Sequence, residues 1–364
     1  MTLRTVAGPG RGPHGIPAAI ALSPILSARY RARDLECIRA AAPGARLVTV
    51  SIEGLADGPL DDVEVLLRGF LSAEAFDRLL GHAPRLTWVH SASAGVERVL
   101  TPIGRERGLV VTNARGVFSR PIAEYVMMMI LAVSRRLPQL LELQRERTWQ
   151  PLEGAELRDV TVGIVGLGSI GRAVGALATA FGCRVIATRR RPEDEADAAA
   201  RSAQGAGGVG AEASHDEPAL GELMLERVTG PEGLADLLAD SDFVVLAAPL
   251  TAATEGMIDE TALAGMKPGA WLINVARGRL VDERALLRAL REGPLGGAVL
   301  DTFRDEPLMP GSPFYDLPNV IVTPHTAWSS GRVLDRSVEL FAENLRRYAA
   351  GEPLLNVVDP AAGY

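Results

Sequence analysis

The chain has 364 residues, of which 47% are hydrophobic and 23% charged, and its formal net charge is -7. This length allows about two domains of ~100 to 200 residues, each large enough to bury its own core. The negative charge argues against nucleic acid or an anionic membrane as a partner, because no broad basic footprint is present.

The cysteine content and the N-terminal segment indicate the cellular compartment of the protein. Cys37 and Cys183 are far apart with no clustered histidines, so we predict neither a disulfide framework nor a metal site. The segment Met1 to Pro17 lacks the apolar core of a signal peptide. The nearest approach to a membrane span, Tyr125 to Val133, is shorter than the ~18 to 20 residues required. We therefore expect a cytoplasmic protein that does not insert into membranes.

In the first third of the chain, short apolar runs alternate with helical stretches. This alternation is typical of a parallel sheet with helices on its faces. The predicted strands are Ala18 to Leu22, Arg46 to Val50, Val63 to Leu67, Leu86 to His90 and Leu109 to Thr112, and the predicted helices are Asp34 to Ala42 and Ser72 to Leu80, the latter with Ser72 as N-cap.

A long helical stretch, Pro121 to Arg147, is expected to bridge to a second domain. A new series of strands follows it, enough for a six-stranded nucleotide-binding sheet. These strands are Thr161 to Val165, Arg184 to Thr188, Phe243 to Ala247, Ala270 to Asn274, Gly297 to Leu300 and Val320 to Val322.

The C-terminal part, a helix at Gly331 to Ala349 and a tail at Leu354 to Val358, has no strand partner of its own. We expect it to return to the first domain, with the active cleft between the two domains. The predicted fold is α/β with two doubly wound parallel-sheet domains. A Rossmann dinucleotide-binding domain, residues 119–326, is inserted in a discontinuous flavodoxin-like substrate domain, residues 1–118 and 327–364.

The segment 193–222 interrupts the rhythm of strands and helices. It is acidic at its start and then rich in glycine, so it cannot bury enough apolar surface to offset the entropy of ordering. We expect a mobile surface insertion whose purpose the sequence leaves open.

The strand Thr161 to Val165 leads into a GxGxxG turn. Gly166 makes the tight turn, Gly168 lets the backbone approach a pyrophosphate, and Gly171 lets the next helix pack closely on the strand. The helix that begins at Ser169 and Ile170 directs backbone N–H groups at the phosphates. The sequence therefore predicts a dinucleotide site here.

Four reactive side chains follow three later strands. These are Arg277, Asp301, Glu306 and His325. Because the carboxyl ends of parallel strands line the ligand crevice of an open sheet, we expect these side chains to converge.

Their chemistry suits the reduction of a 2-oxo acid by a nicotinamide hydride. His325 can donate a proton to the carbonyl oxygen, and a carboxylate at Glu306 favours the imidazolium and fixes its tautomer. Arg277 offers a planar fork of donors that matches a substrate carboxylate and can polarise the adjacent carbonyl.

Taken in order, these segments resemble the D-isomer-specific 2-hydroxyacid dehydrogenases. The resemblance covers about Ala18 to Val358. It is carried by the glycine turn, the block Asn274 to Gly278 with Leu280 to Asp282, the block Asp301 to Pro307, and Thr323-Pro324-His325.

This resemblance implies the catalytic set Arg277, Glu306 and His325, with Asp301 directed toward the nicotinamide carboxamide. It also implies a homodimer built around the bridging helix, where Met127 to Met129 lie, although core packing is the ordinary role of methionine. Further cofactor contacts are assigned to Pro249, Val275 and Ala276. Substrate contacts are assigned to Arg68 and Gly69 and to backbone N–H groups of Ala94 and Gly95.

The end of the second Rossmann strand departs from the pattern of NAD-dependent relatives. An acidic residue normally binds the ribose hydroxyls there, but this chain has Arg189, Arg190 and Arg191. Guanidinium groups pair well with a 2′-phosphate, so NADP(H) is favoured over NAD(H) and reduction is the expected direction.

Some roles remain open at this point. Trp328, with Phe70 and Phe118, either walls the substrate pocket or packs between domains, and His90 is a second candidate at a strand end. Glyoxylate and hydroxypyruvate are possible substrates. The alternative functions are a dehydrogenase of another small anion, such as formate or phosphite, and a dinucleotide-sensing interaction protein resembling the C-terminal binding protein corepressors.

Overall fold

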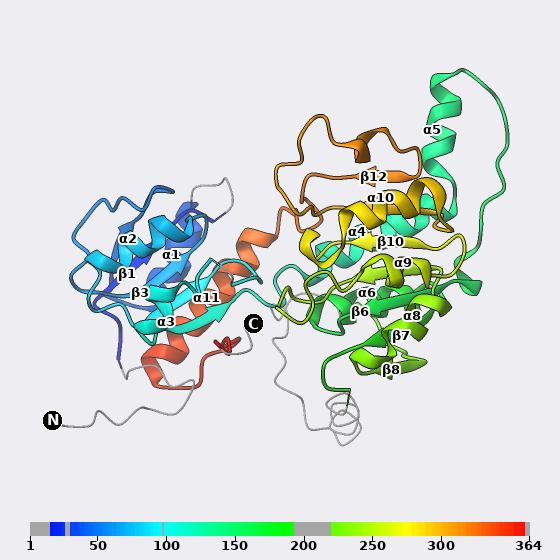
Figure 1. Cartoon of the computed structure of the whole chain (residues 1–364). Helices are drawn as coiled ribbons and strands as arrows, with labels where there is room; N and C mark the ends of the chain where they lie inside the picture. The colour runs from blue at the N-terminus through cyan, green and yellow to red at the C-terminus, as the bar shows by residue number, and fades with distance from the viewer. Residues whose placement is uncertain (1–14, 26–29, 97, 193–219, 361–364) are drawn as a thin grey trace. The chain divides into compact units, whose positions relative to one another are not determined.

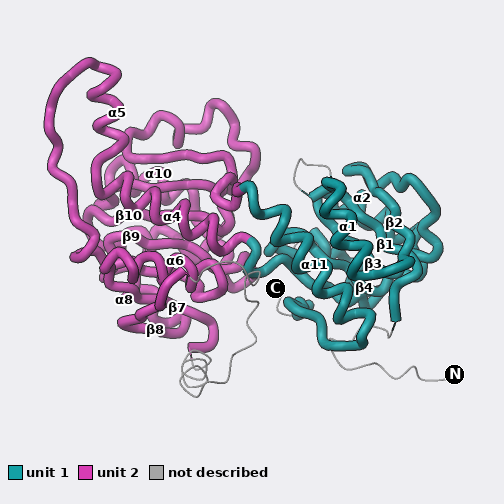
Figure 2. The backbone as a smooth tube through the Cα atoms, turned by 180° about the vertical axis from the view of Figure 1, so that it is seen from behind, with its two compact units in different colours: residues 1–117, 211–217, 331–364 teal, residues 118–210, 218–330 magenta. Residues whose placement is uncertain are grey.

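The computed structural model describes residues 15–25, 30–96, 98–192 and 220–360. These residues form two compact units, unit 1 with 15–117 and 331–360 and unit 2 with 118–192 and 220–330 (Figure 2). Within the described residues the chain passes between the units at 117–118 and at 330–331. The predicted insertion at 193–222 lies outside the described residues apart from 220–222.

Unit 1, in which Figure 1 labels β1 and β3, contains a five-stranded parallel sheet in the order β2-β1-β3-β4-β5. All five strands predicted in this region are confirmed. Their bounds are β1 Ala19–Leu22, β2 Arg46–Thr49, β3 Val63–Arg68, β4 Trp88–Ser91 and β5 Val110–Asn113, and the helices are α1 Ala32–Ala41, α2 Ala73–His82, α3 Pro102–Glu106 and α11 Val333–Ala350.

Both faces of this sheet are covered by apolar side chains, because successive residues of a strand point to opposite faces. Ala19 and Ala21 pack in one core with Phe76 of α2, whereas Ile20 packs in the other with Phe341 of α11. Helix α2 begins as predicted, with the Ser72 Oγ accepting a hydrogen bond from the Ala75 N–H at 3.1 Å.

The C-terminal helix and tail belong to unit 1. Helix α11 packs against α1, and an ion pair joins Arg33 to Asp335 at 2.8 Å. The expectation that the tail lacks a strand partner is wrong. Val357 forms an antiparallel bridge with Thr112 of β5, and the Asn113 N–H donates to the carbonyl of Asn356 at 3.1 Å.

Unit 2 contains a seven-stranded sheet in the order β12-β11-β10-β9-β6-β7-β8, all parallel. The six predicted strands are present, and the prediction of six was wrong by one strand, β8. Strand β8 has three residues and no buried position, so it left little apolar signal. The bounds are β6 Thr161–Val165, β7 Arg184–Thr188, β8 Arg227–Thr229, β9 Phe243–Leu246, β10 Trp271–Asn274, β11 Gly297–Leu300 and β12 Val320–Val322.

Two helical layers cover this sheet, α4 and α6 on one core and α8, α9 and α10 on the other. Helix α6 begins at Ser169 as predicted. The helix bounds are α4 Ser119–Ser134, α5 Leu137–Arg145, α6 Ser169–Ala180, α8 Leu234–Asp240, α9 Glu260–Ala264 and α10 Glu283–Glu292, with 3-10 turns η1 Leu157–Asp159, η2 Pro231–Gly233, η3 Gly278–Leu280 and η4 Pro313–Asp316.

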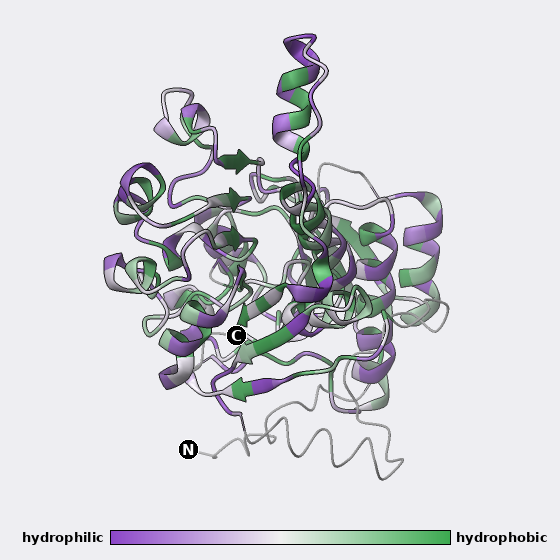
Figure 3. Ribbon diagram, turned by 90° about the vertical axis from the view of Figure 1, so that its right-hand side faces the viewer, coloured by the Kyte–Doolittle hydropathy of each residue, from purple (hydrophilic) through white to green (hydrophobic). Residues whose placement is uncertain are grey.

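The predicted helix Pro121 to Arg147 is two helices. It breaks at Arg136, whose φ of 53° is left-handed, and α5 then projects from the sheet (Figure 1). Met127 and Met129 are buried in the core of unit 2, whereas Met128 is 52% exposed. Apolar and polar residues lie side by side on the projecting helix (Figure 3). No helix within the described residues is long and apolar enough to span a membrane.

His90 is a core residue of unit 1 and not a group at an open strand end, which corrects its candidacy as a site residue. Its side chain is fully buried on β4, where Nδ1 lies 2.8 Å from the Thr112 Oγ1. The Trp88 Nε1 donates to the same oxygen at 2.9 Å. Burial lowers the pKa of His90 to about 3, so the imidazole is neutral in the folded protein near neutral pH.

Replacing His90 with Gln is expected to reduce the acid sensitivity of the fold. Below pH ~6.5 the unfolded chain binds a proton that folded His90 does not, so the free energy of unfolding falls by about 1.4 kcal/mol per pH unit. His90→Gln removes this contribution. Urea unfolding followed by circular dichroism at pH 7 and pH 5 measures it, with exposed His82→Gln as the matched control. An equal loss of stability in His90→Gln and wild type would contradict the prediction.

Candidate active site

The predicted site residues of unit 2 follow the carboxyl ends of its strands. The strand order reverses between β6 and β9, since β6, β7 and β8 run to one side and β9 to β12 to the other (Figure 1). Such a reversal is where open α/β sheets bind ligands. Gly166 follows β6, Pro249 follows β9 and Asp301 follows β11.

The glycine turn after β6 has the close contacts that the sequence predicted. Gly166 has a φ of 100°, and a Cβ there would lie 2.6 Å from the Ala248 Cα. A Cβ on Gly171 would lie 2.3 Å from the Gly166 carbonyl oxygen. A Cβ on Gly168, by contrast, would meet no atom within 4 Å. The turn therefore has no room for a side chain at Gly166 and Gly171, whereas the space beside Gly168 is open.

The first turn of α6 is suited to an anion. Gly168 is its N-cap, so no side chain caps the N–H groups of Ser169 and Ile170, and the first turn holds no acidic residue. These N–H groups and the helix dipole favour a phosphate in the open space at Gly168. The residues present therefore fit a dinucleotide pyrophosphate.

The other predicted cofactor residues lie in loops at the same edge. Pro249 is exposed, and its carbonyl accepts a hydrogen bond from the Thr254 Oγ1 at 2.7 Å. Val275 and Ala276 are buried, and the Ala276 N–H donates to the Asn274 Oδ1 at 3.1 Å. These bonds fix the loops after β9 and β10.

Arg189 and Arg190 directly follow β7, next to the glycine turn. The Arg189 N–H donates to the Thr229 carbonyl at 2.9 Å, and the Thr188 carbonyl accepts from the N–H groups of Gly166 and Leu167 at 3.0 and 3.1 Å. Arg189 is partly exposed and Arg190 exposed. The arginines that would bind a 2′-phosphate therefore follow directly on a residue, Thr188, that is hydrogen-bonded to the turn that would bind the pyrophosphate.

His325 and Glu306 form a hydrogen-bonded pair. The His325 Nδ1 lies 2.8 Å from the Glu306 Oε2, and the Phe303 N–H donates to the Glu306 Oε1 at 3.0 Å. Because an ionised carboxylate only accepts, Nδ1 carries the hydrogen and Nε2 is the second ring nitrogen left for chemistry. The two side chains are 41% and 37% exposed, so a small molecule can reach them.

The charge state of Glu306 follows from these partners. Burial acts to raise the pKa of Glu306. The hydrogen bonds from His325 and the Phe303 N–H, with the charges of His325 and Arg277, outweigh burial and lower that pKa below its usual value. Glu306 is therefore a carboxylate near neutral pH.

Arg277 lies in the loop after β10, close enough for its charge to act on Glu306. The Asn274 Nδ2 donates to the Arg277 carbonyl at 2.9 Å, and Arg277 itself donates to the Ala276 carbonyl at 2.8 Å. The next residue, Gly278, packs so closely on the Phe303 backbone that a Cβ would lie 1.9 Å from the Phe303 carbonyl carbon. These contacts fix the backbone on both sides of Arg277.

Asp301 anchors the His325 loop. Its Oδ1 accepts from the Thr323 Oγ1 at 2.6 Å and the Thr326 N–H at 2.8 Å, and its Oδ2 accepts from the Ala327 N–H at 3.0 Å. A carboxylate has about four acceptor positions, so these three bonds leave one for the predicted contact with a carboxamide. His325 has a left-handed φ of 50°, a conformation that costs on the order of 1 kcal/mol and that these bonds hold.

In unit 1 the predicted substrate residues differ in availability. The Arg68 side chain is buried, donates to the Leu71 carbonyl and lies 5.4 Å from the centre of the Phe76 ring, and burial, aided by Arg98, lowers the pKa of Arg68 to about 10. The Gly69 N–H donates to the Ser23 Oγ at 2.7 Å. These contacts lie within unit 1, and the Arg68 Nε is buried with no hydrogen-bond partner among the described residues.

Ala94 and Gly95 keep their backbone donors. Their carbonyls accept from the Asn113 Nδ2 at 2.9 Å and the Ser93 Oγ at 2.6 Å. Within the part of the chain that the structure describes, their N–H groups donate to no protein group. These two N–H groups therefore fit the predicted contact with a carboxylate.

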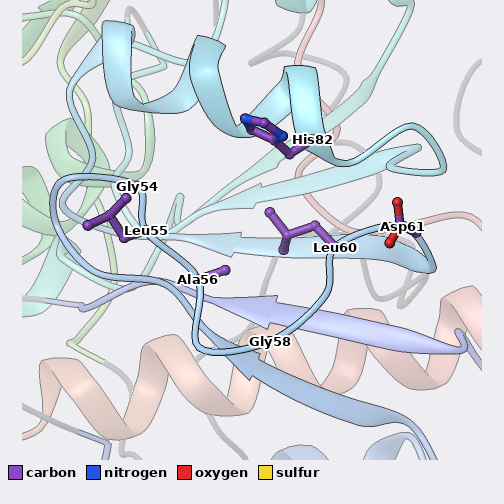
Figure 4. A pocket seen from close by; sticks show the side chains of 7 residues that line it. All are labelled: Gly54, Leu55, Ala56, Gly58, Leu60, Asp61 and His82. Atoms are coloured by element: carbon purple, nitrogen blue, oxygen red, sulfur yellow. The ribbon is translucent and has the colours of Figure 1, made fainter.

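A cavity of about 300 Å³ in unit 1 contains none of the predicted site residues (Figure 4). It lies between the loop 54–61 and the end of α2, where Asp61 and His82 are its charged or titratable side chains.

The aromatic residues whose role was open have different surroundings. Trp328 and Phe118 are partly buried and pack against the core of unit 2, whereas Phe70 is 50% exposed on unit 1. Two polar residues beside the site, Thr323 and Tyr125, were not assigned a role from the sequence. Thr323 lies in the motif Thr323-Pro324-His325, but Tyr125 lies in an apolar helix whose pattern does not indicate a functional residue.

The chain is similar to known 2-hydroxyacid dehydrogenases. Residues 127–213 and 214–327 match the family model described as D-isomer specific 2-hydroxyacid dehydrogenase, NAD binding domain. A glyoxylate reductase of Korarchaeum cryptofilum is 33% identical over 334 residues, which are 90% of this chain and 90% of that protein.

Two solved structures are also similar. A D-isomer specific 2-hydroxyacid dehydrogenase from Xanthobacter autotrophicus Py2, in complex with NADPH and MES, has a TM-score of 0.77, 30% identity, and coverage of 96% of this chain and 100% of that chain. An NADPH-dependent glyoxylate/hydroxypyruvate reductase from Sinorhizobium meliloti, with NADP and sulfate, has a TM-score of 0.74, 28% identity, and coverage of 95% and 100%.

Two glycine substitutions separate the cofactor role of the turn from its structural role. Gly168→Ala places a methyl group in open space and is expected to leave the melting temperature nearly unchanged while weakening dinucleotide binding at least tenfold. Gly166→Ala forces a methyl group onto Ala248 at a left-handed φ and is expected to lower the melting temperature by several degrees. Thermal unfolding and fluorescence titration with NADPH measure the two effects. Undiminished NADPH affinity in Gly168→Ala would contradict the assignment.

Proposed function

Because the chain belongs to the D-isomer-specific 2-hydroxyacid dehydrogenase family and is an NAD(P)-dependent oxidoreductase, we propose that it reduces a small 2-oxo acid to the (R)-2-hydroxy acid. The observation that carries this proposal is the 2.8 Å contact between the His325 Nδ1 and the Glu306 Oε2, with Arg277 beside it. Glyoxylate and hydroxypyruvate are the proposed substrates, in line with the names of the similar reductases.

The proposed mechanism assigns one task to each side chain. When bound, the reduced nicotinamide supplies the hydride that reaches the carbonyl carbon. His325 donates the Nε2 proton to the carbonyl oxygen, so the oxygen becomes a hydroxyl and the ring becomes neutral. Glu306 holds the Nδ1–H and stabilises the imidazolium before transfer. Arg277 binds the substrate carboxylate and polarises the carbonyl.

Ala94 and Gly95 are proposed as further ligands of the substrate carboxylate. Their partly exposed N–H groups offer two backbone donors, which suit a carboxylate oxygen. Under this proposal, unit 1 is the substrate domain and unit 2 the cofactor domain.

NADPH is the proposed cofactor. Arg189 and Arg190 stand where an acidic residue would bind a ribose hydroxyl, and two guanidinium groups favour the 2′-phosphate. The solved relatives from Xanthobacter autotrophicus and Sinorhizobium meliloti contain NADPH or NADP. Since cells commonly keep this cofactor reduced, reduction of the 2-oxo acid is the proposed direction.

A homodimer is proposed around the projecting helix α5. Its side chains Leu137, Leu140 and Leu141 are 45%, 39% and 44% exposed, and the nearby Trp149 is fully exposed. Apolar side chains gathered on one projecting element mark a surface that another protein covers. A second copy of this chain is the proposed partner.

His325→Ala is expected to lower kcat for 2-oxo acid reduction by about 10²- to 10⁴-fold, because the proton donor is lost. The dissociation constant for NADPH should stay within about twofold, since the imidazole contacts Glu306, which is not among the predicted cofactor ligands. Absorbance at 340 nm with a panel of 2-oxo acids measures turnover, with exposed His82→Ala as control. A wild type that oxidises neither NADPH nor NADH with any panel member would refute the enzyme assignment.

Replacing Arg189 and Arg190 with Gln should raise the KM for NADPH by about 10- to 100-fold and change the KM for NADH by less than threefold. The loss of charge-assisted hydrogen bonds to the 2′-phosphate is the cause. Initial rates at varied NADPH and NADH measure both constants. Arg284→Gln, an exposed arginine on α10, is the control. Equal changes for the two cofactors would overturn the phosphate assignment.

A further inference from the structure

A chain of three hydroxyl and carboxylate groups runs from the core of unit 2 to the His325 loop. The Tyr125 hydroxyl on α4 lies 2.6 Å from the Thr323 Oγ1, and the Thr323 Oγ1 donates to the Asp301 Oδ1 at 2.6 Å. Tyr125 is only 9% exposed and packs in the core between α4 and α6. The three residues come from parts of the sequence far apart, and neither Tyr125 nor Thr323 has a role in the mechanism above.

The two hydrogen bonds that join Tyr125, Thr323 and Asp301 have a fixed donor-to-acceptor direction. An ionised Asp301 only accepts, so the single hydrogen of the Thr323 hydroxyl points to Asp301. The Thr323 Oγ1 must therefore accept from the Tyr125 hydroxyl. Burial, helped by the charge of Asp301, raises the pKa of Tyr125 to about 12, so this donor keeps its hydrogen throughout the pH range of an assay.

The chain ends on the backbone that shapes the His325 loop. Asp301 receives the N–H groups of Thr326 and Ala327, and the Thr323 carbonyl accepts the His325 N–H at 3.0 Å. These contacts lie on both sides of His325, the residue with the left-handed φ of 50°. A shift of Thr323 or Asp301 would rotate the loop and lengthen the contact between His325 and Glu306.

We propose that Tyr125 is a positioning residue for His325, acting through Thr323 and Asp301 to hold the imidazole in line with Glu306. This role rests on the proposed function, in which His325 is the proton donor. Tyr125 does not touch the reacting atoms. Its hydroxyl donates to the Thr323 Oγ1 and so fixes the Thr323 side chain that bonds to Asp301.

A core tyrosine without a hydroxyl partner would leave a buried polar group unsatisfied. The Thr323 hydroxyl in the loop after β12 supplies that partner for Tyr125 on α4. Phenylalanine would fit the same apolar space, which makes Tyr125→Phe a mild change for the fold. The hydroxyl is thus used for the contact with Thr323 and not for packing.

The first experiment compares kcat with the KM for NADPH. Tyr125→Phe is expected to lower kcat by about three- to tenfold and leave the KM for NADPH within twofold, since a small misplacement of a catalytic group slows the chemical step. Thr323→Val should lower kcat similarly, whereas Thr323→Ser keeps the hydroxyl and should restore it. The double variant Tyr125→Phe/Thr323→Val should be no slower than Thr323→Val alone, because both changes break one chain.

Tyr315→Phe is the matched control, since Tyr315 is 51% exposed on η4 outside this chain of hydrogen bonds, and it should keep wild-type kcat. A second readout does not need turnover. Hydrogen exchange at the Thr326 and Ala327 amides should be at least threefold faster in Tyr125→Phe, while the Ala298 amide of β11, bonded to the Asn319 carbonyl, should be unchanged.

Unchanged kcat together with unchanged exchange at Thr326 and Ala327 would overturn the role of Tyr125. Additive losses in the double variant would also count against it, because they would mean two separate effects. A wild type that reduces no 2-oxo acid would instead overturn the proposed function, and the exchange measurement would still decide whether Tyr125 holds the loop.

Discussion

The hydrogen bond between the Glu306 Oε2 and the His325 Nδ1 is the contact on which the functional interpretation depends. It fixes the tautomer of the imidazole, and in the proposed mechanism it leaves Nε2 for the substrate and keeps a negative charge beside the ring. Other residues hold both side chains in this position. Glu306 is held by the Phe303 N–H, and His325 sits in a left-handed conformation that Asp301 secures.

The parallel sheet of unit 2 explains how distant residues meet. Each strand delivers its following loop to the same edge, so Gly166, Arg277, Asp301 and His325 gather although up to 159 positions separate them. Small residues then bring the loops into contact. Gly278 packs on the Phe303 backbone, and Gly166 packs on Ala248, with no room for a side chain at either position. The close packing of these glycines on neighbouring backbone therefore determines the positions of the loops, as the contacts of the charged side chains also do.

The sequence predicted what depends on strand pattern and missed what depends on tertiary packing. The buried strands and the glycine turn were readable because each has a local signature, and the Glu306–His325 contact was inferred from strand ends. Strand β8, the break at Arg136 and the burial of His90 had no such signature. The contact of the Arg68 guanidinium with the Leu71 carbonyl also had no local signature. Tyr125 was hidden because its contact with Thr323 spans 198 positions.

A crystal structure of the protein with NADPH and oxalate tests the central claim most directly, since oxalate has the shape and charge of a 2-oxo acid. We predict that an oxalate oxygen lies within about 3.2 Å of the His325 Nε2, with Arg277 donating to the oxalate and Glu306 still bonded to Nδ1. Oxalate bound away from His325 and Arg277, or an imidazole turned away from Glu306, would contradict the account.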